Sequence, residues 1–510
     1  MIRENWRFAL LTVLVLVSLG AVFVPGTVGS ADGATNLQYG LQLSGGAQLD
    51  TTLVGVTAEG VNVTRQNEVR IEEQVAGRFQ NLSSLDVNAR PSSDTVEVFA
   101  DVQPSRLASA LDVIGVSYDR VRTGVTAATR QSTVQILSSK LDAAGYAGGE
   151  VQIQRSAGQH YVSISVPNAN VSDVQNLIAD RGRVVISVLF PQTQGSNATY
   201  KRYPLFSGGG EEQAYRKPVS PPEMINGEPA VRLTLRQQAA ENFSDALQKF
   251  GFVDRAIETG QQGICYYQQR PDDPGYCIMT ELDGEVVHAA GLAPGLAQTI
   301  QSGAFVQNPR FHITAANMSQ ARELQISLQA GALPAPLEMA NSFYIGPSFA
   351  QTTLQFSFYT GLIAVIAVSL VVYLRYGDAK VALPMIVTAL SEVVIILGFM
   401  AAIQMALDLS HIAGLIAVIG TGVDDLVIIA DEVMTQEVSS ARVFQSRFRK
   451  ALWVIGAAAV TTIIAMSPLA VLSLGNLWGF AVVTIFGVLV GVLITRPAYG
   501  DILRRLLTSH

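Results

Sequence analysis

Charged residues are scarce in this chain. Of its 510 residues, 15% are Asp, Glu, Lys or Arg, whereas 49% are hydrophobic and the mean hydropathy is +0.31. Soluble globular proteins carry about 25% charged residues, so the composition argues against a wholly soluble enzyme. The hydrophobic residues concentrate in segments 8–24 and 356–494. We therefore expect membrane segments near both ends and a water-soluble region between them.

Clusters of basic residues are also missing. Residues 25–350 hold 23 Lys and Arg against 31 Asp and Glu, a balance of −8. Binding to the phosphates of nucleic acid requires clustered Lys and Arg, so no nucleic-acid partner is expected. A mildly acidic, solvated surface, such as one adapted to high salt, is the plain interpretation of this charge.

Catalytic and metal-binding motifs are absent from the sequence. There is no P-loop, no nucleophile elbow and no zinc signature. The histidines are scattered, and none lies at ligand spacing from a cysteine. We therefore expect no enzymatic activity, no cofactor and no metal site. The histidines are His160, His288, His312, His411 and His510.

Cysteine is rare as well. Cys265 and Cys277 are the only two, and the turn-forming sequence Asp-Asp-Pro-Gly at 272–275 lies between them. A disulfide that closes a hairpin loop is the expected arrangement in an oxidising compartment. Two buried free thiols are the alternative.

Six segments are apolar enough to cross a membrane, which takes about 20 residues of helix. The segments are 8–24, 356–373, 381–403, 412–430, 451–472 and 477–494. Lys and Arg occur before the first segment, in alternate loops and after the sixth, whereas loops 404–411 and 473–476 contain none. Because basic short loops remain in the cytoplasm, both termini are predicted to be cytoplasmic and residues 25–350 to lie outside the cytoplasmic membrane.

The first segment has an alternative interpretation as a cleaved signal peptide. Small residues at 28–31 would allow cleavage. The apolar run at 8–24 is longer than the roughly 7–15 residues usual in signal peptides, which favours an uncleaved anchor.

The middle region alternates short strand patterns with amphipathic helices, which predicts an α+β fold. The segment 133–190 follows the order helix, strand, strand, helix, strand, as in half of a ferredoxin-like fold. Segments 68–114 and 318–344 hold partial copies of this pattern. The predicted fold is therefore six membrane helices plus a large α+β domain with ferredoxin-like repeats.

Gly- and Pro-rich sequences at 207–210 and 218–222 interrupt the repeats. They could be hinges that permit rigid-body motion or tolerated surface loops. The predicted domains are the first span at 1–24, an α+β base at 25–191 and 309–350, an inserted subdomain at 192–308, and the remaining spans with a cytoplasmic tail at 351–510.

Carboxylates inside the apolar segments are the candidate functional residues. Asp424 and Asp425 lie in the fourth segment and Glu392 in the third. Each costs roughly 2.5–3.5 kcal/mol at a membrane-helix centre, so each must face the bundle interior, water or a partner. The functional interpretation is a proton or cation relay. The alternative is a static hydrogen bond to Ser391, Thr388, Thr421 or backbone near Gly420 and Gly422.

Two further features bear on the relay. Neighbouring residues point about 100° apart on a helix, so Asp424 and Asp425 cannot both face the same partner. We find no Lys or Arg within the predicted segments, so any countercharge is expected to come from another chain. The pair Gly487 and Gly491 predicts close helix packing, either with a partner or within the bundle.

Several segments together resemble the SecD family of protein-export membrane proteins, in the resistance-nodulation-division superfamily. The sequence GLQLSGG at 40–46 looks like the GLDLRGG motif of the family, through Gly40, Leu41, Gly45 and Gly46. Residues 161–190 resemble its second motif. Residues 324–337 and 345–348 closely match the third, through Gly331, Pro334, Pro336, Gly346 and Pro347, and 414–432 is similar to the fourth, with an acid at Asp424.

Departures from the bacterial pattern suggest the archaeal branch of the family. Gln42 and Ser44 replace an acid and an Arg, and Asp425 replaces an Ala. The resemblance implies a six-span half that pairs with SecF beside a SecY-type translocon, in contact with membrane lipid. The outer domains would grip an exported polypeptide while protons or sodium ions cross. A superfamily exporter of small molecules or lipids, and a non-transporting scaffold, are the alternatives.

Overall fold

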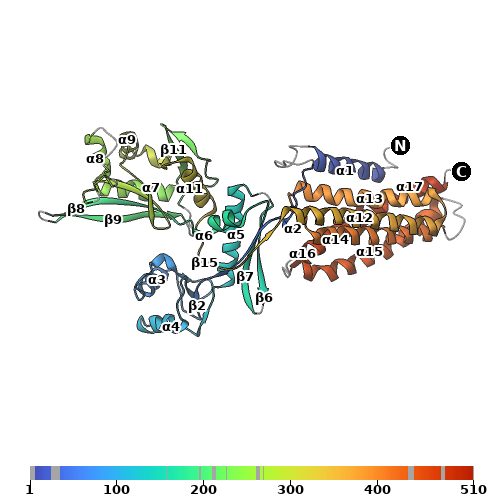
Figure 1. Cartoon of the computed structure of the whole chain (residues 1–510), viewed down its shortest axis with the longest axis horizontal. Helices are drawn as coiled ribbons and strands as arrows, with labels where there is room; N and C mark the ends of the chain where they lie inside the picture. Colours follow the sequence, from blue (N-terminus) through green and yellow to red (C-terminus); the bar gives the residue numbers. More distant parts are fainter. Residues whose placement is uncertain are drawn as a thin grey trace. The chain divides into compact units, whose positions relative to one another are not determined.

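The computed structural model describes residues 6–24, 35–146, 148–156, 158–194, 197–208, 214–225, 227–259, 265–267, 269–270, 272–434, 441–471 and 477–508 (Figure 1). The chain forms two compact units. The first, here the membrane unit, comprises residues 1–50, 147–171 and 341–510, and the second, here the α+β unit, comprises 51–146 and 172–340. The small residues at 28–31, the glycines at 209–210 and the loop 473–476 lie outside the described residues.

The membrane unit contains the six predicted membrane-crossing helices, and their number is confirmed. The first five follow the predicted segments, and the sixth continues through a π-helical turn, η3, to Leu506. The helices are α1 (Trp6–Phe23), α12 (Pro347–Tyr376), α13 (Ala379–Ala402), α14 (Leu409–Met434), α15 (Ala441–Val471), and α16 (Leu477–Val490), η3 (Gly491–Thr495) and α17 (Arg496–Thr508) in succession.

Local sequence sets where these helices begin and end. Pro347 occupies the first turn of α12, where its missing N–H costs no helical hydrogen bond. Gly377 ends α12 in the left-handed conformation, at φ 61°. The Asp378 carboxylate then caps α13 by accepting from the Lys380 N–H at 2.9 Å. About half of the residues of α13 and α14 are buried in the bundle, whereas few residues of α12 and α15 are fully buried.

A four-stranded sheet with the order β15-β1-β7-β6 adjoins the helices of the membrane unit. The short helix α2 (Leu41–Ser44) precedes β1 and packs on α12 and β7. Gly45 and Gly46 have φ values of 77° and 137°, and a side chain on either would collide with the carbonyl of Ile345 or Val166. Glycine is therefore required at both positions. The strands are β1 (Gly46–Leu53), β6 (Glu150–Ser156), β7 (Gln159–Pro167) and β15 (Leu337–Ile345).

The α+β unit holds three further sheets, in the orders β3-β4-β2-β5, β13-β12-β8-β9 and β10-β11-β14. Its strands are β2 (Val56–Glu59), β3 (Val87–Arg90), β4 (Thr95–Val98), β5 (Arg120–Thr123), β8 (Val184–Gln194), β9 (Asn197–Gly208), β10 (Glu223–Ile225), β11 (Glu228–Thr234), β12 (Cys277–Leu282), β13 (Glu285–Ala290) and β14 (Arg310–Thr314). Its main helices are α3 (Glu68–Ala76), α4 (Pro104–Val113), α5 (Ala127–Ala144), α6 (Val171–Ala179), α7 (Gln237–Lys249), α8 (Phe252–Thr259), α9 (Pro294–Gln301) and α11 (Met318–Ala330).

The predicted element order at 133–190 is present as α5, β6, β7, α6 and β8. The last strand, however, pairs with β9 and β12 rather than with β6 or β7. The reason is burial: Val184, Ile186 and Val188 of β8 belong to the hydrophobic core around Phe243 of α7. This core extends as far as Leu328, past both ends of the predicted insert at 192–308.

Candidate ion-relay site in the membrane helices

Three ionisable side chains from three helices meet inside the bundle. Arg496, at the start of α17, donates from Nη1 to Oε2 of Glu392 on α13 at 2.5 Å. Its Nε and Nη2 lie 3.3 and 3.2 Å from Oδ2 of Asp425 on α14. The side chains of Arg496 and Glu392 are 2% and 3% exposed, and that of Asp425 is 21% exposed. We call these three residues the inner cluster.

Arg496 corrects the expectation that no basic residue lies within the spans. The hydropathy pattern ends the sixth segment at 494, so Arg496 counts there as a flanking, solvated residue. In the structure the helix continues, and Arg496 is buried against α13 and α14. A countercharge for Glu392 and Asp425 is therefore present within this chain.

Two glycines make the space for the buried guanidinium. A methyl group at Gly491 would overlap Nη1 and Cζ of Arg496, and one at Gly422 would lie 3.4 Å from Nη2. Gly487, the other member of the predicted glycine pair, lies directly against Val418 of α14. The pair thus serves packing within the bundle. Glycines within apolar segments that also hold or adjoin a charged residue, such as Gly422 and Gly491, are a signal that could have located the cluster from sequence.

Glu392 has one satisfied and one unsatisfied oxygen. Oε2 accepts from Arg496 and, at 3.0 Å, from the Thr495 hydroxyl. Oε1 is buried and has no hydrogen-bond partner among the described residues. The sequence offered Thr388, Ser391 and Thr421 as donors of a static hydrogen bond to the buried acids. None of the three donates to Oε1 of Glu392, because each hydroxyl donates to a carbonyl of its own helix.

Asp424 faces a different way from Asp425. It is exposed, and so are Thr421 and Ile428, which share its side of α14 at intervals of three and four residues. The described residues give Asp424 no ion pair and no hydrogen bond. The structure thus brings Asp425 and Glu392 together and leaves Asp424 on an exposed side of α14. We call this side, with Thr421, Asp424 and Ile428, the open stripe of α14.

Asp408 is an acidic residue that the sequence interpretation passed over. It lies in the loop between α13 and α14, where Gly40 packs so closely that any side chain at 40 would overlap the Asp408 carboxylate. Burial, and secondarily the charge of Glu150, raises the pKa of Asp408 to about 6. The close approach explains Gly40 of the first motif. An acid within a loop free of Lys and Arg was the available signal.

The other motif residues have local structural roles. Gly331 ends α11 with φ 95°. The carbonyls of Pro334 and Pro336 accept hydrogen bonds from Arg181 and from the Val54 N–H within the α+β unit. Gly346 and Pro347 begin α12. None of these residues joins the inner cluster.

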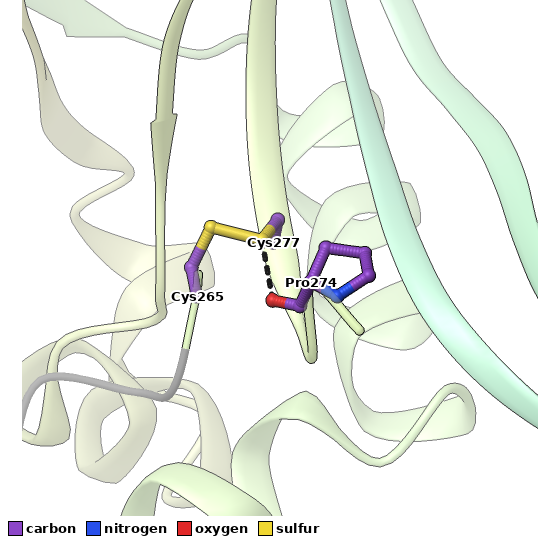
Figure 2. Close-up of a disulfide and its surroundings, with 3 residues drawn as sticks. All are labelled: Cys265, Pro274 and Cys277. Atoms are coloured by element: carbon purple, nitrogen blue, oxygen red, sulfur yellow. Dashed lines mark hydrogen bonds between the residues drawn. A yellow bond between two sulfur atoms is a disulfide. The ribbon is translucent and has the colours of Figure 1, made fainter. Parts of the chain in front are cut away.

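Cys265 and Cys277 are bonded as a disulfide in the α+β unit (Figure 2). The turn at 272–275 lies between them, and Tyr266 donates its N–H to the carbonyl of Pro274 at 2.7 Å. Cys277 begins β12 and is fully buried. The disulfide therefore fastens the loop to the start of β12, an inner strand of its sheet.

Six apolar helices, an α+β unit and a buried carboxylate–guanidinium cluster define an integral membrane protein with ionisable groups inside its helix bundle. Residues 330–499 match the family described as protein export membrane protein SecD/SecF, C-terminal. The chain is 46% identical to the protein-export membrane protein SecD of Haloquadratum walsbyi, over 100% of this chain and 99% of the relative. Identity to SecD of Haloferax volcanii is 45%, with the same coverage.

The chain belongs to the SecD family of protein-export membrane proteins. Among solved structures, it is similar to a crystal structure of SecDF, a translocon-associated membrane protein from Thermus thermophilus. The sequence identity is 19% and the TM-score is 0.48, over 99% of this chain and 59% of that chain.

Proposed function

We propose that this chain is an auxiliary subunit of the Sec protein-export machinery. It acts with SecF and uses an ion gradient, with protons as the ion, to promote polypeptide translocation across the cytoplasmic membrane. Membership of the SecD family supports the export role. Both termini lie in the cytoplasm and the α+β unit lies outside, where a disulfide between Cys265 and Cys277 is stable.

The exposed position of Asp424 is the main support for pairing with a second membrane protein. Its carboxylate is exposed on the open stripe of α14, and lipid there would impose a cost of roughly 2.5–3.5 kcal/mol at the bilayer centre. A partner that supplies a cation or a hydrogen-bond donor removes this cost. Ala413 and Thr421 on the same side of the helix are small enough to admit a close helix contact. SecF is the partner that we propose for this stripe.

The α+β unit offers a site for the exported polypeptide. A cavity of about 590 Å³ is lined by strands β8, β12, β13 and β14 and by residues of helices α7 and α9. Its walls are mainly apolar, and a few polar groups interrupt them, which suits contact with extended chains of varied sequence. The lining includes Phe243, Leu296, Phe305 and Phe311, together with His288 and Arg310. We propose that this cavity receives apolar side chains of the cargo.

Asp424→Asn tests the ion-driven function. Membrane vesicles that contain the variant, SecF and the translocon are expected to export at the rate of vesicles without a gradient. Asp254→Asn is the matched control, because Asp254 is an exposed residue on α8 of the α+β unit. A correctly inserted Asp424→Asn variant that keeps gradient-dependent export at the wild-type rate would disprove the relay.

A further inference from the structure

We propose that Glu392, Asp425 and Arg496 bind one proton as a single site enclosed within this chain, and that Oε1 of Glu392 is the atom that carries it. The proposal rests on the ion-driven function proposed above. It adds a second proton site to the exposed Asp424. Asp425, the member of the inner cluster on α14, points about 100° away from Asp424 around that helix.

Charge balance is the first reason. Arg496 carries one positive charge at any physiological pH. With both carboxylates ionised, the inner cluster has a net charge of −1. Glu392 and Arg496 are 2% and 1% exposed, and an uncompensated charge in such surroundings is strongly unfavourable. One proton taken from water makes the cluster neutral.

The hydrogen bonds of the cluster indicate where this proton resides. Oε2 of Glu392 already accepts from Arg496 and Thr495, whereas Oε1 is buried without a partner among the described residues. A carboxylic acid carries its proton on one oxygen and accepts with the other, which matches this arrangement. Asp425 is more exposed and faces two N–H groups of Arg496, so it keeps its negative charge.

Outside the inner cluster, the solvent-exposed Asp424 acts on this site through its like charge beside Asp425. The elements packed against α13 are α1, α12, α14, α16, η3 and α17. Among the described residues, Arg496 and Asp425 are the charged side chains that act on Glu392, and Thr495 adds a neutral donor. The Tyr499 hydroxyl, one helical turn after Arg496 on α17, is buried and has no hydrogen-bond partner among the described residues. Asp501 pairs with Arg7, and Arg375 pairs with Asp431.

Infrared spectroscopy of the purified full-length chain in lipid nanodiscs at neutral pH counts protonated carboxylic acids by their C=O stretching band. The expected number of protonated acids in each variant is the number that makes the inner cluster neutral. Wild type shows one such acid in the cluster, and Glu392→Gln and Asp425→Asn show none, because Arg496 then faces a single carboxylate. Arg496→Gln shows two, because no cation remains. Asp424→Asn, outside the cluster, keeps the wild-type band, and Glu392→Asp keeps a shifted band.

Several outcomes would overturn the proposal. One is a wild-type spectrum without the band, and another is an Asp425→Asn spectrum that retains it. A third is a wild-type band that is present in choline chloride and lost in sodium chloride, which would assign the neutralising ion to sodium. If Glu392→Gln does not fold, Asp425→Asn makes the same change in charge from a different helix.

These spectra require neither SecF nor cargo, so they separate the two proposals. An unchanged band in Asp425→Asn, together with loss of export in Asp424→Asn, rejects the enclosed site and leaves the ion-driven function standing. The expected band pattern, together with wild-type export that does not respond to an ion gradient, supports the enclosed site as a proton site and rejects the ion-driven function.

Discussion

Gly491 offers a test of the inner cluster through packing alone. A methyl group at this position would overlap the guanidinium of Arg496, which is buried and cannot retreat into water. Overpacking in a core destabilises a protein by about 1–3 kcal/mol. If the guanidinium also loses Glu392, a charge is left buried without its partner, and the loss rises to about 3–5 kcal/mol. Gly491→Ala is therefore expected to lower the unfolding midpoint clearly.

Gly420→Ala is the matched control for this change. Gly420 lies in α14, also within a membrane-crossing helix, but no atom would lie within 4 Å of a methyl group there. Alanine is favoured over glycine in helices by roughly 0.8–1.0 kcal/mol, so this variant is expected to equal or exceed wild type. The measurement is the apparent unfolding midpoint of the purified chain in detergent. Equal midpoints for the two variants would refute the packing of Arg496 against Gly491.

Two further predictions concern the disulfide and the loop acid. Cys265 and Cys277 are 12 residues apart, and a crosslink over such a short loop contributes about 3 kcal/mol. Cys265→Ser is expected to lower the unfolding midpoint of the α+β unit to that of the reduced wild type, and a wild type insensitive to reductant would contradict this. For Asp408, the pKa of about 6 in the fold exceeds the value of about 3.9 for an unfolded Asp. Ionisation therefore destabilises the fold progressively between these two values and fully above them. Asp408→Asn is expected to raise the unfolding midpoint above about pH 6 and to change it little near pH 4, and an equal gain at both would exclude titration of Asp408 as the cause.

The membrane helices could be predicted from sequence because a span has a physical minimum length and must be apolar throughout. The same physics led to the error at Arg496. Hydropathy treats a guanidinium as the end of a span, but a basic residue with two carboxylates and two facing glycines can remain inside. That compensation depends on contacts between helices that are far apart in sequence, so no local window contains it.

The two acids of α14 show the same limit on a smaller scale. Helix geometry required Asp424 and Asp425 to point apart, and sequence alone did not say which one faces Glu392. The family motif favoured Asp424, whereas the structure places Asp425 beside Glu392 and Arg496.

Strand β8 of the α+β unit could likewise be located from sequence, but its partners could not. Its alternating pattern is the same whichever sheet the strand joins. The partners follow from the core around Phe243, which buries Val184, Ile186 and Val188 together. Phe243 belongs to a helix that comes much later in the chain, so the sequence of the strand alone does not predict this contact.

The π-helical turn at Gly491–Thr495 makes the sixth helix sensitive to its length. A π-turn holds one residue more than an α-helical turn needs, so removing a single residue there would restore regular α-helix. Everything after the deletion would then rotate by about 100°. Arg496, Tyr499 and Leu503, all buried on one side, would leave the bundle together. A substitution in this turn changes contacts only around that position. The number of residues in the turn determines which side of the whole carboxy-terminal helix faces the bundle.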